Sequence, residues 1–409
     1  MRYVTDSNRN ISAILAFMLI PISGFAMDVY VPSFPAMVHD LGTSVSNVRL
    51  TMTIFLISYG VSQLFVGSII DSYGRYKLCL ASLVAFIITN IVIVLTRSIE
   101  VIFVMRALQG FLISVIMVSK RSLFIDVFEG EKQKHYTSLL SVVWSAAPVI
   151  APFLGGYLQH VFAWRANFYF LAIYAFVMLL LELRYSGETL ARTKPFHLGS
   201  VVNTYKKMIG TPDFAYGIVV LGLSYSMAII FGMSAPFLIE NVFHYSSVVT
   251  GYAALSSGIA LLLGGMLSKY MIARDFMTKL TTANYIQGVF AVAMFATAGM
   301  FSTIFPIMFF VVALHFLMGF MYNIYFTYCL TRFPENAGIS GGITSGGGYI
   351  VTSIFSYALA SILNIHNQQT FAISYIILIV LIGVMLLFLR AYLNKPKAVN
   401  TFKTEDIKQ

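Results

Sequence analysis

Charged residues are scarce in this chain. Asp, Glu, Lys and Arg make up 10% of its 409 residues, whereas soluble proteins carry about 25%. Hydrophobic residues account for 58% of the chain, and the mean hydropathy is +0.83. A soluble surface needs more charge than this. The composition therefore excludes a set of soluble domains and predicts a polytopic membrane protein.

Cysteine is almost absent. Cys79 and Cys329 lie far apart, within or beside apolar segments, so we expect no disulfide framework or metal site and interpret both as packed in the interior. The formal net charge of +10 does not indicate nucleic acid binding, because the Lys and Arg residues form no stripe with stacking aromatic residues. The basic residues lie mainly between the apolar runs.

Twelve apolar windows are each long enough to cross a bilayer, which takes roughly 20 residues. They are 11–34, 47–70, 78–96, 99–122, 136–160, 166–184, 213–239, 249–272, 279–301, 303–330, 337–364 and 369–393. One long polar connection separates six windows from six. We predict an all-α integral membrane protein with two six-helix bundles, 1–184 and 213–394, a cytoplasmic linker, 185–212, and a cytoplasmic tail, 395–409.

The distribution of basic residues indicates the orientation. If the amino terminus is cytoplasmic, 22 of the 26 Lys and Arg residues lie in or beside cytoplasmic segments; Arg49, Arg97 and Arg165 lie outside, and Arg106 lies within the membrane. Lys and Arg are retained on the cytoplasmic side, so both termini are predicted to be cytoplasmic. The first apolar run is too long for a signal-peptide core and lacks a cleavage site, so we expect it to remain as the first helix.

The segment GSIIDSYGRYK, residues 67–77, resembles the loop motif G-x(3)-D-x(2)-G-R-x-K of the major facilitator superfamily. The matching residues are Gly67, Asp71, Gly74, Arg75 and Lys77. The resemblance implies that superfamily's fold and a cytoplasmic gate, with Gly67 in a close helix contact and Asp71 near the start of helix eleven, around 337–340. A helix amino terminus attracts a carboxylate. The alternative is a positively charged loop with an incidental acid.

Two charges interrupt the apolar windows. Asp28 lies in the first, and Arg106 opens RALQGFLISVI, which resembles the superfamily's helix-four motif R-x(2)-Q-G. Each is about seven residues, or roughly 10 Å, from the outer end of its helix, and we hypothesise that they meet across the bundle. Such charges are costly unless they face a wet cavity or a partner. Alternatively, Arg106 is an anchor that extends to the membrane surface, and Asp28 is permanently ionised by it.

His315, in the tenth window, is the third ionisable group at membrane depth. An imidazole can relay protons near neutral pH, but a neutral hydrogen-bonding role in the core is the favoured interpretation. Further candidates for a substrate cavity are polar or aromatic, although one sequence does not determine which helix faces point inward. They are Tyr30, Tyr59, Gln63, Gln109, Tyr225, Asn284, Tyr285 and Asn323.

The segment APVIAPFLGGYL, residues 147–158, resembles the antiporter motif G-x(3)-G-P-x(2)-G-G of exporters in the superfamily. Ala147 and Ala151 stand where glycines are usual, whereas the candidate motif residues are Pro148, Pro152, Gly155 and Gly156. The resemblance implies export. Close packing of small residues is the alternative, and importers show it too.

Several segments resemble the bicyclomycin and chloramphenicol resistance (Bcr/CflA) subfamily of twelve-helix drug:proton antiporters. MDVYVPSFPAM around Asp28 is similar to its helix-one signature D-M-Y-L-P-A-x-P, and further similarity lies at 164–175, 234–243 and 336–343. The resemblance implies a bacterial inner-membrane protein in which Asp28 carries the proton. Desolvation favours a protonated carboxyl group, and a substrate would compete with that proton.

We therefore expect a proton-coupled antiporter for multidrug efflux that works as a monomer by alternating access. No cofactor is expected, because TSGGGYI, residues 344–350, lacks the lysine and the strand of a phosphate-binding loop. Alternatives are a dedicated exporter of one metabolite, such as a siderophore or sugar, and a proton-coupled importer. An enzyme is disfavoured, because the three ionisable groups lie on separate helices with no motif joining them.

Overall fold

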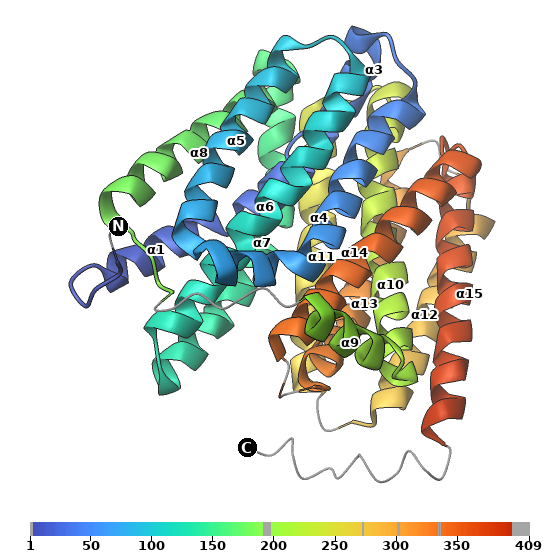
Figure 1. Cartoon of the computed structure of the whole chain (residues 1–409). Helices are drawn as coiled ribbons and strands as arrows, with labels where there is room; N and C mark the ends of the chain where they lie inside the picture. Colours follow the sequence, from blue (N-terminus) through green and yellow to red (C-terminus); the bar gives the residue numbers. More distant parts are fainter. Residues whose placement is uncertain are drawn as a thin grey trace.

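This computed structural model describes residues 3–190, 198–271, 274–300, 303–333, 335 and 337–394. The regular structure in these residues is helical. No strand forms within those residues, and an isolated backbone bridge joins Tyr3 to Glu188. The helices form two groups, coloured blue to green and yellow to red in Figure 1. The predicted all-α fold is confirmed. Residues 191–197 of the predicted linker and the predicted tail, 395–409, lie outside the described residues.

In the amino-terminal half, the first predicted span is broken into short pieces. Pro21, Pro32 and Pro35 each lie at the start of a new piece, because proline lacks the N–H that would continue the preceding helix. The helices of this half are α1 (Arg9–Leu19), α2 (Ile22–Asp28), η1 (Val31–Ser33), α3 (Phe34–Leu41), α4 (Val45–Tyr73), α5 (Arg75–Leu95), α6 (Ile99–Val127), α7 (Gly130–Phe162) and α8 (Arg165–Tyr185).

A short helix, α9 (Leu198–Ile209), precedes the carboxyl-terminal half and lies in the segment predicted as the linker. The first long helix of this half ends in a π-helical turn, η2 (Leu238–Val242). The helices of this half are α10 (Pro212–Phe237), α11 (Ser247–Tyr270), α12 (Phe276–Ala296), α13 (Ile304–Thr331), α14 (Ala337–Ile362) and α15 (Gln368–Leu393).

Nine of the twelve predicted spans are long and apolar enough to cross a membrane, within the described residues. The other three windows form α7, α12 and α14, which are 33, 21 and 26 residues long. Polar residues lower the hydropathy of α12, and six glycines lower that of α14. These three helices pack on other helices, α7 on α11, α12 on α15, and α14 on α4 and α10.

The two halves repeat one pattern of helix pairs. The pairs α4–α6, α5–α8 and α5–α6 of the first half correspond to α11–α13, α12–α15 and α12–α13 of the second. Between the halves, α4 packs on α14 and α7 packs on α11. We call the end of the bundle where α5 begins and α15 ends the terminal end, and the opposite end the far end. Both Cys79 and Cys329 are buried, as expected.

Candidate functional site

Asp28 is the last residue of α2, at the first break in the opening helix. Only 7% of the residue is exposed, and its Oδ2 has no hydrogen-bond partner among the described residues. A buried polar atom without a partner is unusual in a protein interior and calls for a functional explanation. The carboxyl group is therefore available to bind a proton or a ligand.

Arg106 on α6 is fully buried and is held by neutral groups. Its Nη1 donates to the carbonyl of Ala26 at 2.9 Å and to Oε1 of Gln109 at 2.7 Å. The guanidinium carbon lies 4.3 Å from the centre of the Phe55 ring and 4.6 Å from that of Tyr30. Arg106 thus does not extend to the membrane surface, which excludes the anchor alternative.

Asp28 and Arg106 are neighbours, because Arg106 donates to the carbonyl of Ala26, two residues before Asp28. No ion pair joins them, however, within the part of the chain that the structure describes. Asp28 and Arg106 therefore lie in the same region, as we hypothesised, but their side chains do not form a direct ion pair. Backbone and amide acceptors occupy Nη1 of Arg106, whereas its Nη2 has no hydrogen-bond partner among the described residues.

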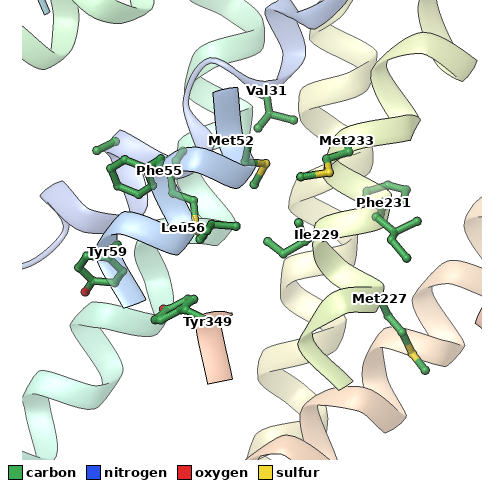
Figure 2. Packing of buried hydrophobic residues seen from close by; sticks show 14 of the residues in the cluster. Val31, Met52, Phe55, Leu56, Tyr59, Met227, Ile229, Phe231, Met233 and Tyr349 are labelled. Carbon is green, nitrogen blue, oxygen red and sulfur yellow. The ribbon is translucent and has the colours of Figure 1, made fainter. Parts of the chain in front are cut away.

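A cluster of four tyrosines lies between the halves, and we call it the tyrosine cluster. It comprises Tyr59 of α4, Tyr225 of α10, Tyr322 of α13 and Tyr349 of α14. Ring centroids are 5.2 Å apart for Tyr59 and Tyr349, 6.1 Å for Tyr225 and Tyr349, and 5.7 Å for Tyr225 and Tyr322. Figure 2 shows Tyr59 and Tyr349 pointing toward each other. The ring of Tyr59 stacks on that of Phe55 with centroids 6.0 Å apart, and Phe55 lies against Arg106, so the tyrosine cluster adjoins the region of Asp28 and Arg106.

Three further cavity candidates also lie in the amino-terminal half. The hydroxyl groups of Tyr30 and Thr51 are hydrogen-bonded at 2.9 Å. Gln109 supports Arg106, as described above. Gln63 is half-buried. It lies where α4 meets α14, since a Cβ at Gly342 of α14 would be 3.1 Å from its backbone carbonyl oxygen.

One cavity candidate, Tyr285 on α12, is wrong, because it is 73% exposed and faces outward. That prediction failed because every face of such a helix is apolar, so periodicity does not separate inner from outer faces. Asn284 lies against Gly383 of α15, and Asn323 of α13 accepts a hydrogen bond from Ser268 of α11 at 2.8 Å. These contacts lie between helices of the same half.

His315 belongs to a neutral hydrogen-bonded chain across four helices. Its Nδ1 lies 2.5 Å from Oγ of Ser257, and its Nε2 lies 2.8 Å from the hydroxyl oxygen of Tyr375. Tyr375 donates to the carbonyl of Met227 at 3.1 Å, so its oxygen accepts from Nε2–H, and Ser257 donates to Nδ1. This assignment of protons follows from the partners. It fits the neutral interpretation of His315.

The residues of the loop motif make contacts within their own half. Nη2 of Arg75 lies 2.8 Å from Asp71, and Nη1 binds Asp126. The carboxylate of Glu188 accepts from the backbone N–H of Arg75 and of Tyr76, at 3.3 and 3.1 Å. Asp126, near the end of α6, and Glu188, which follows α8, were not predicted, since each stands in a polar segment like many other acids.

One expectation for this loop is wrong in this structure, the close helix contact at Gly67. The carboxylate of Asp71 accepts from Arg75, one helical turn away, and among the described residues no hydrogen bond or ion pair joins Asp71 to α14. A side chain at Gly67 would meet nothing within 4 Å, so Gly67 makes no close contact. Gly74 has a φ of +96°, in the region that favours glycine, and Lys77 is exposed.

The antiporter-like motif brings α7 very close to its neighbours. A Cβ at Gly155 would lie 1.6 Å from the carbonyl oxygen of Val29, directly after Asp28, and one at Gly156 would lie 2.5 Å from that of Ser247 on α11. Pro148 packs beside Gly24, and the carbonyl of Pro152 approaches Gly251 of α11. The motif therefore positions the chain break at Asp28 and joins the two halves.

Arg49, which was counted only as an outside residue, is buried at the far end with 2% exposure. It donates to three carbonyls of the other half: to Met233 at 3.0 Å, to Ala360 at 2.9 Å and to Ile365 at 3.4 Å. The ring of Phe237 lies 5.3 Å away. We call this set the Arg49 clasp. Its position inside the second apolar window was the signal that could have identified it.

Further contacts between the halves also lie at the far end. Ser46 bonds to the hydroxyl of Tyr357 at 3.1 Å, and the hydroxyls of Tyr157 and Tyr252 are 2.9 Å apart. Two repeated helical bundles with a buried acid and contacts that close the far end are typical of secondary transporters, which bind their substrates between the halves.

The chain belongs to the Major Facilitator Superfamily, whose family model matches residues 16–356. In the solved structure of a bacterial homologue of the human lysosomal transporter Spinster, the same fold covers 94% of this chain and 97% of that one, with a TM-score of 0.74 and 13% identity. Membership makes this chain a transporter rather than an enzyme.

Curated relatives confirm the resemblance to drug:proton antiporters. The chain is 30% identical to the uncharacterized MFS-type transporter YdgK of Bacillus subtilis (64% of this chain, 66% of that one). It is 31% identical to multidrug resistance protein D of Escherichia coli (50% and 52%) and to a chloramphenicol resistance protein of Pseudomonas aeruginosa (37% and 36%). The matches thus span between about a third and two thirds of these relatives.

Proposed function

We propose that the protein is a proton-coupled antiporter that exports small amphipathic compounds from bacteria by alternating access. In this proposal it works as a monomer in the inner membrane, with both termini in the cytoplasm and with the proton gradient, not a cofactor, as its energy source. The observation that carries the proposal is the buried, unpaired carboxyl group of Asp28 beside the tyrosine cluster. The names of the drug-resistance relatives support export.

The proposed coupling is competition at Asp28. Burial away from water favours a neutral carboxyl group, and a nearby cation favours the carboxylate, so a ligand that enters the site can shift this balance. The tyrosine rings offer apolar surface and faces for cations. Because Arg106 is held by neutral acceptors, it contributes a fixed charge without neutralising Asp28.

Alternating access requires the far-end contacts to open. The Arg49 clasp, the Tyr157–Tyr252 pair and the contact of Gly156 with Ser247 hold α4 and α7 against the other half. Release to the far side would break these contacts while the terminal end closes. A dedicated metabolite exporter uses the same cycle, and uptake would run it in reverse.

The test measures proton release from purified, detergent-solubilised protein on addition of chloramphenicol or tetraphenylphosphonium. We expect release from the wild type, and none from Asp28→Asn although the ligand still binds. The matched control is Asp275→Asn. Hydrogen bonds from Thr278 hold the pKa of Asp275 below its usual range, so this acid carries no proton to release near neutral pH.

Three outcomes would contradict the proposal. Equal proton release from Asp28→Asn and wild type would remove Asp28 from the coupling. In vesicles, accumulation of the compound on the side that protons enter would identify an importer. A response to one compound class alone would identify a dedicated exporter.

A further inference from the structure

An apolar groove of about 900 Å³ lies on the outer surface of the carboxyl-terminal half. It is bounded by α11, α12 and α13 at the far end, and it is distinct from the tyrosine cluster. Several of its side chains are strongly exposed: Phe305 at 75%, Phe309 at 63% and Tyr252 at 48%. The lining is nearly all apolar, with Tyr245, Tyr252 and Ser256 as its polar members.

Two glycines determine where the groove ends. A Cβ at Gly264 of α11 would lie 1.8 Å from the carbonyl oxygen of Phe316, and one at Gly319 of α13 would lie 2.0 Å from that of Leu261. The two backbones therefore touch at this level. The groove begins one or two residues away, at Leu263 and Leu317, and continues toward the far end.

The dimensions match one leaflet of a bilayer. Along α13 the groove extends from Ile304 to Leu317, which is roughly 20 Å at 1.5 Å per residue. One leaflet is about 15 Å of hydrocarbon, or about 20–22 Å with its interfacial region. Tyr245 lies at the far-end limit of the groove, where a tyrosine suits the boundary between headgroups and hydrocarbon.

We propose that this groove binds one acyl chain of a phospholipid from the leaflet at the far end. The groove opens to the hydrocarbon around a membrane-spanning bundle, where an empty hollow would lose dispersion contacts. The occupant contacts Tyr252, whose hydroxyl bonds to Tyr157 of the other half and whose ring packs 5.1 Å from Phe153. The bound chain thereby stabilises the closed far end. This inference does not depend on the direction of transport.

The test uses tryptophan as a reporter and brominated lipid as a quencher. Phe309→Trp places the reporter in the groove, and Phe388→Trp places it at a similarly exposed site on α15 (53%). Purified protein in detergent is titrated with phosphatidylcholine brominated on its acyl chains, and the quenching of wild-type protein is subtracted. We expect saturable quenching in the groove and a gradual, non-saturating decrease at the control site.

Variants that fill the groove sharpen the test. Ala313→Phe and Ser256→Leu fill it from opposite walls, and each is expected to weaken the saturable phase roughly tenfold. Ala81→Phe, on an exposed site of α5, leaves it unchanged. Identical quenching at the two reporter sites, or a saturable phase that both filled variants keep, would overturn the proposal. Displacement of the lipid by tetraphenylphosphonium would also do so, because it assigns the groove to the transported compound.

Discussion

The two halves of the molecule share one arrangement of helices but bury different kinds of polar group. In the equivalent helices α6 and α13, the first half carries Arg106 and the second carries His315. Arg106 is a cation held among carbonyls and rings, whereas His315 is a neutral member of a hydrogen-bonded chain. The first half also buries the ion pair of Lys120 and Glu182, 2.6 Å apart. The second half buries one carboxylate, Asp213, which pairs with Arg332 at 2.7 Å, so more of the buried charge lies in the first half.

This contrast indicates a division of labour. Buried charges are expensive and are retained where they serve function, while satisfied neutral groups fix the packing of helices. We infer that the first half responds to protons and the second provides a stable surface against which it moves.

The largest expected effect is the loss of Arg106. Arg106→Ala leaves the carbonyl of Ala26 and the amide of Gln109 without their donor, at about 1–3 kcal/mol each, and it removes the charge beside Asp28. We expect transport in vesicles to fall at least roughly tenfold. Arg97→Ala, at an exposed site of the same half, is the control. Equal activity of the two variants would contradict the role given to buried charge.

A second way to test the contrast is to break the buried ion pair. Lys120→Ala leaves Glu182 as an unpaired buried carboxylate, which costs about 3–5 kcal/mol. The midpoint of thermal unfolding in detergent should fall markedly. The double variant Lys120→Met with Glu182→Gln should recover most of the loss. If Lys120→Ala were as stable as wild type, the ion pair of Lys120 and Glu182 would not contribute to the stability of the fold.

The Arg49 clasp predicts an intermediate effect. Arg49→Ala removes three hydrogen bonds between the halves, and the far end should open more often. Spin labels on Ser44→Cys and Asn364→Cys, at exposed far-end sites, report the separation, because the native cysteines are buried. Longer distances are expected for Arg49→Ala than for Arg97→Ala. Unchanged distances would mean that the clasp does not hold the end closed.

The smallest effect is expected for His315, in the neutral hydrogen-bonded chain of the second half. His315→Gln can keep one of two hydrogen bonds, so we expect a loss of about 1 kcal/mol in stability. Ligand-induced proton release should persist within a few per cent of wild type. Loss of that release would identify His315 as a proton relay and would contradict the inference that only the first half responds to protons.

Hydropathy and motifs predicted much of this molecule. The apolar windows correspond to the long helices, and the depth of Asp28 and Arg106 follows from their positions in those windows. Contacts between distant helices were not predictable in the same way. Tyr349 lies in a glycine-rich stretch that suggested only packing, and the partners of Arg49 are backbone carbonyls, which every residue possesses.

The sequences of α12 and α14 bear on how the chain enters the membrane during synthesis. Insertion of a single helix depends on its own hydrophobicity. Polar residues interrupt α12 and glycines interrupt α14, and within the described residues neither is apolar enough to count as a span by itself. Each is followed along the chain by a strongly apolar helix, α13 after α12 and α15 after α14. We expect each to leave the translocon together with that neighbour, which makes their biogenesis a cooperative step.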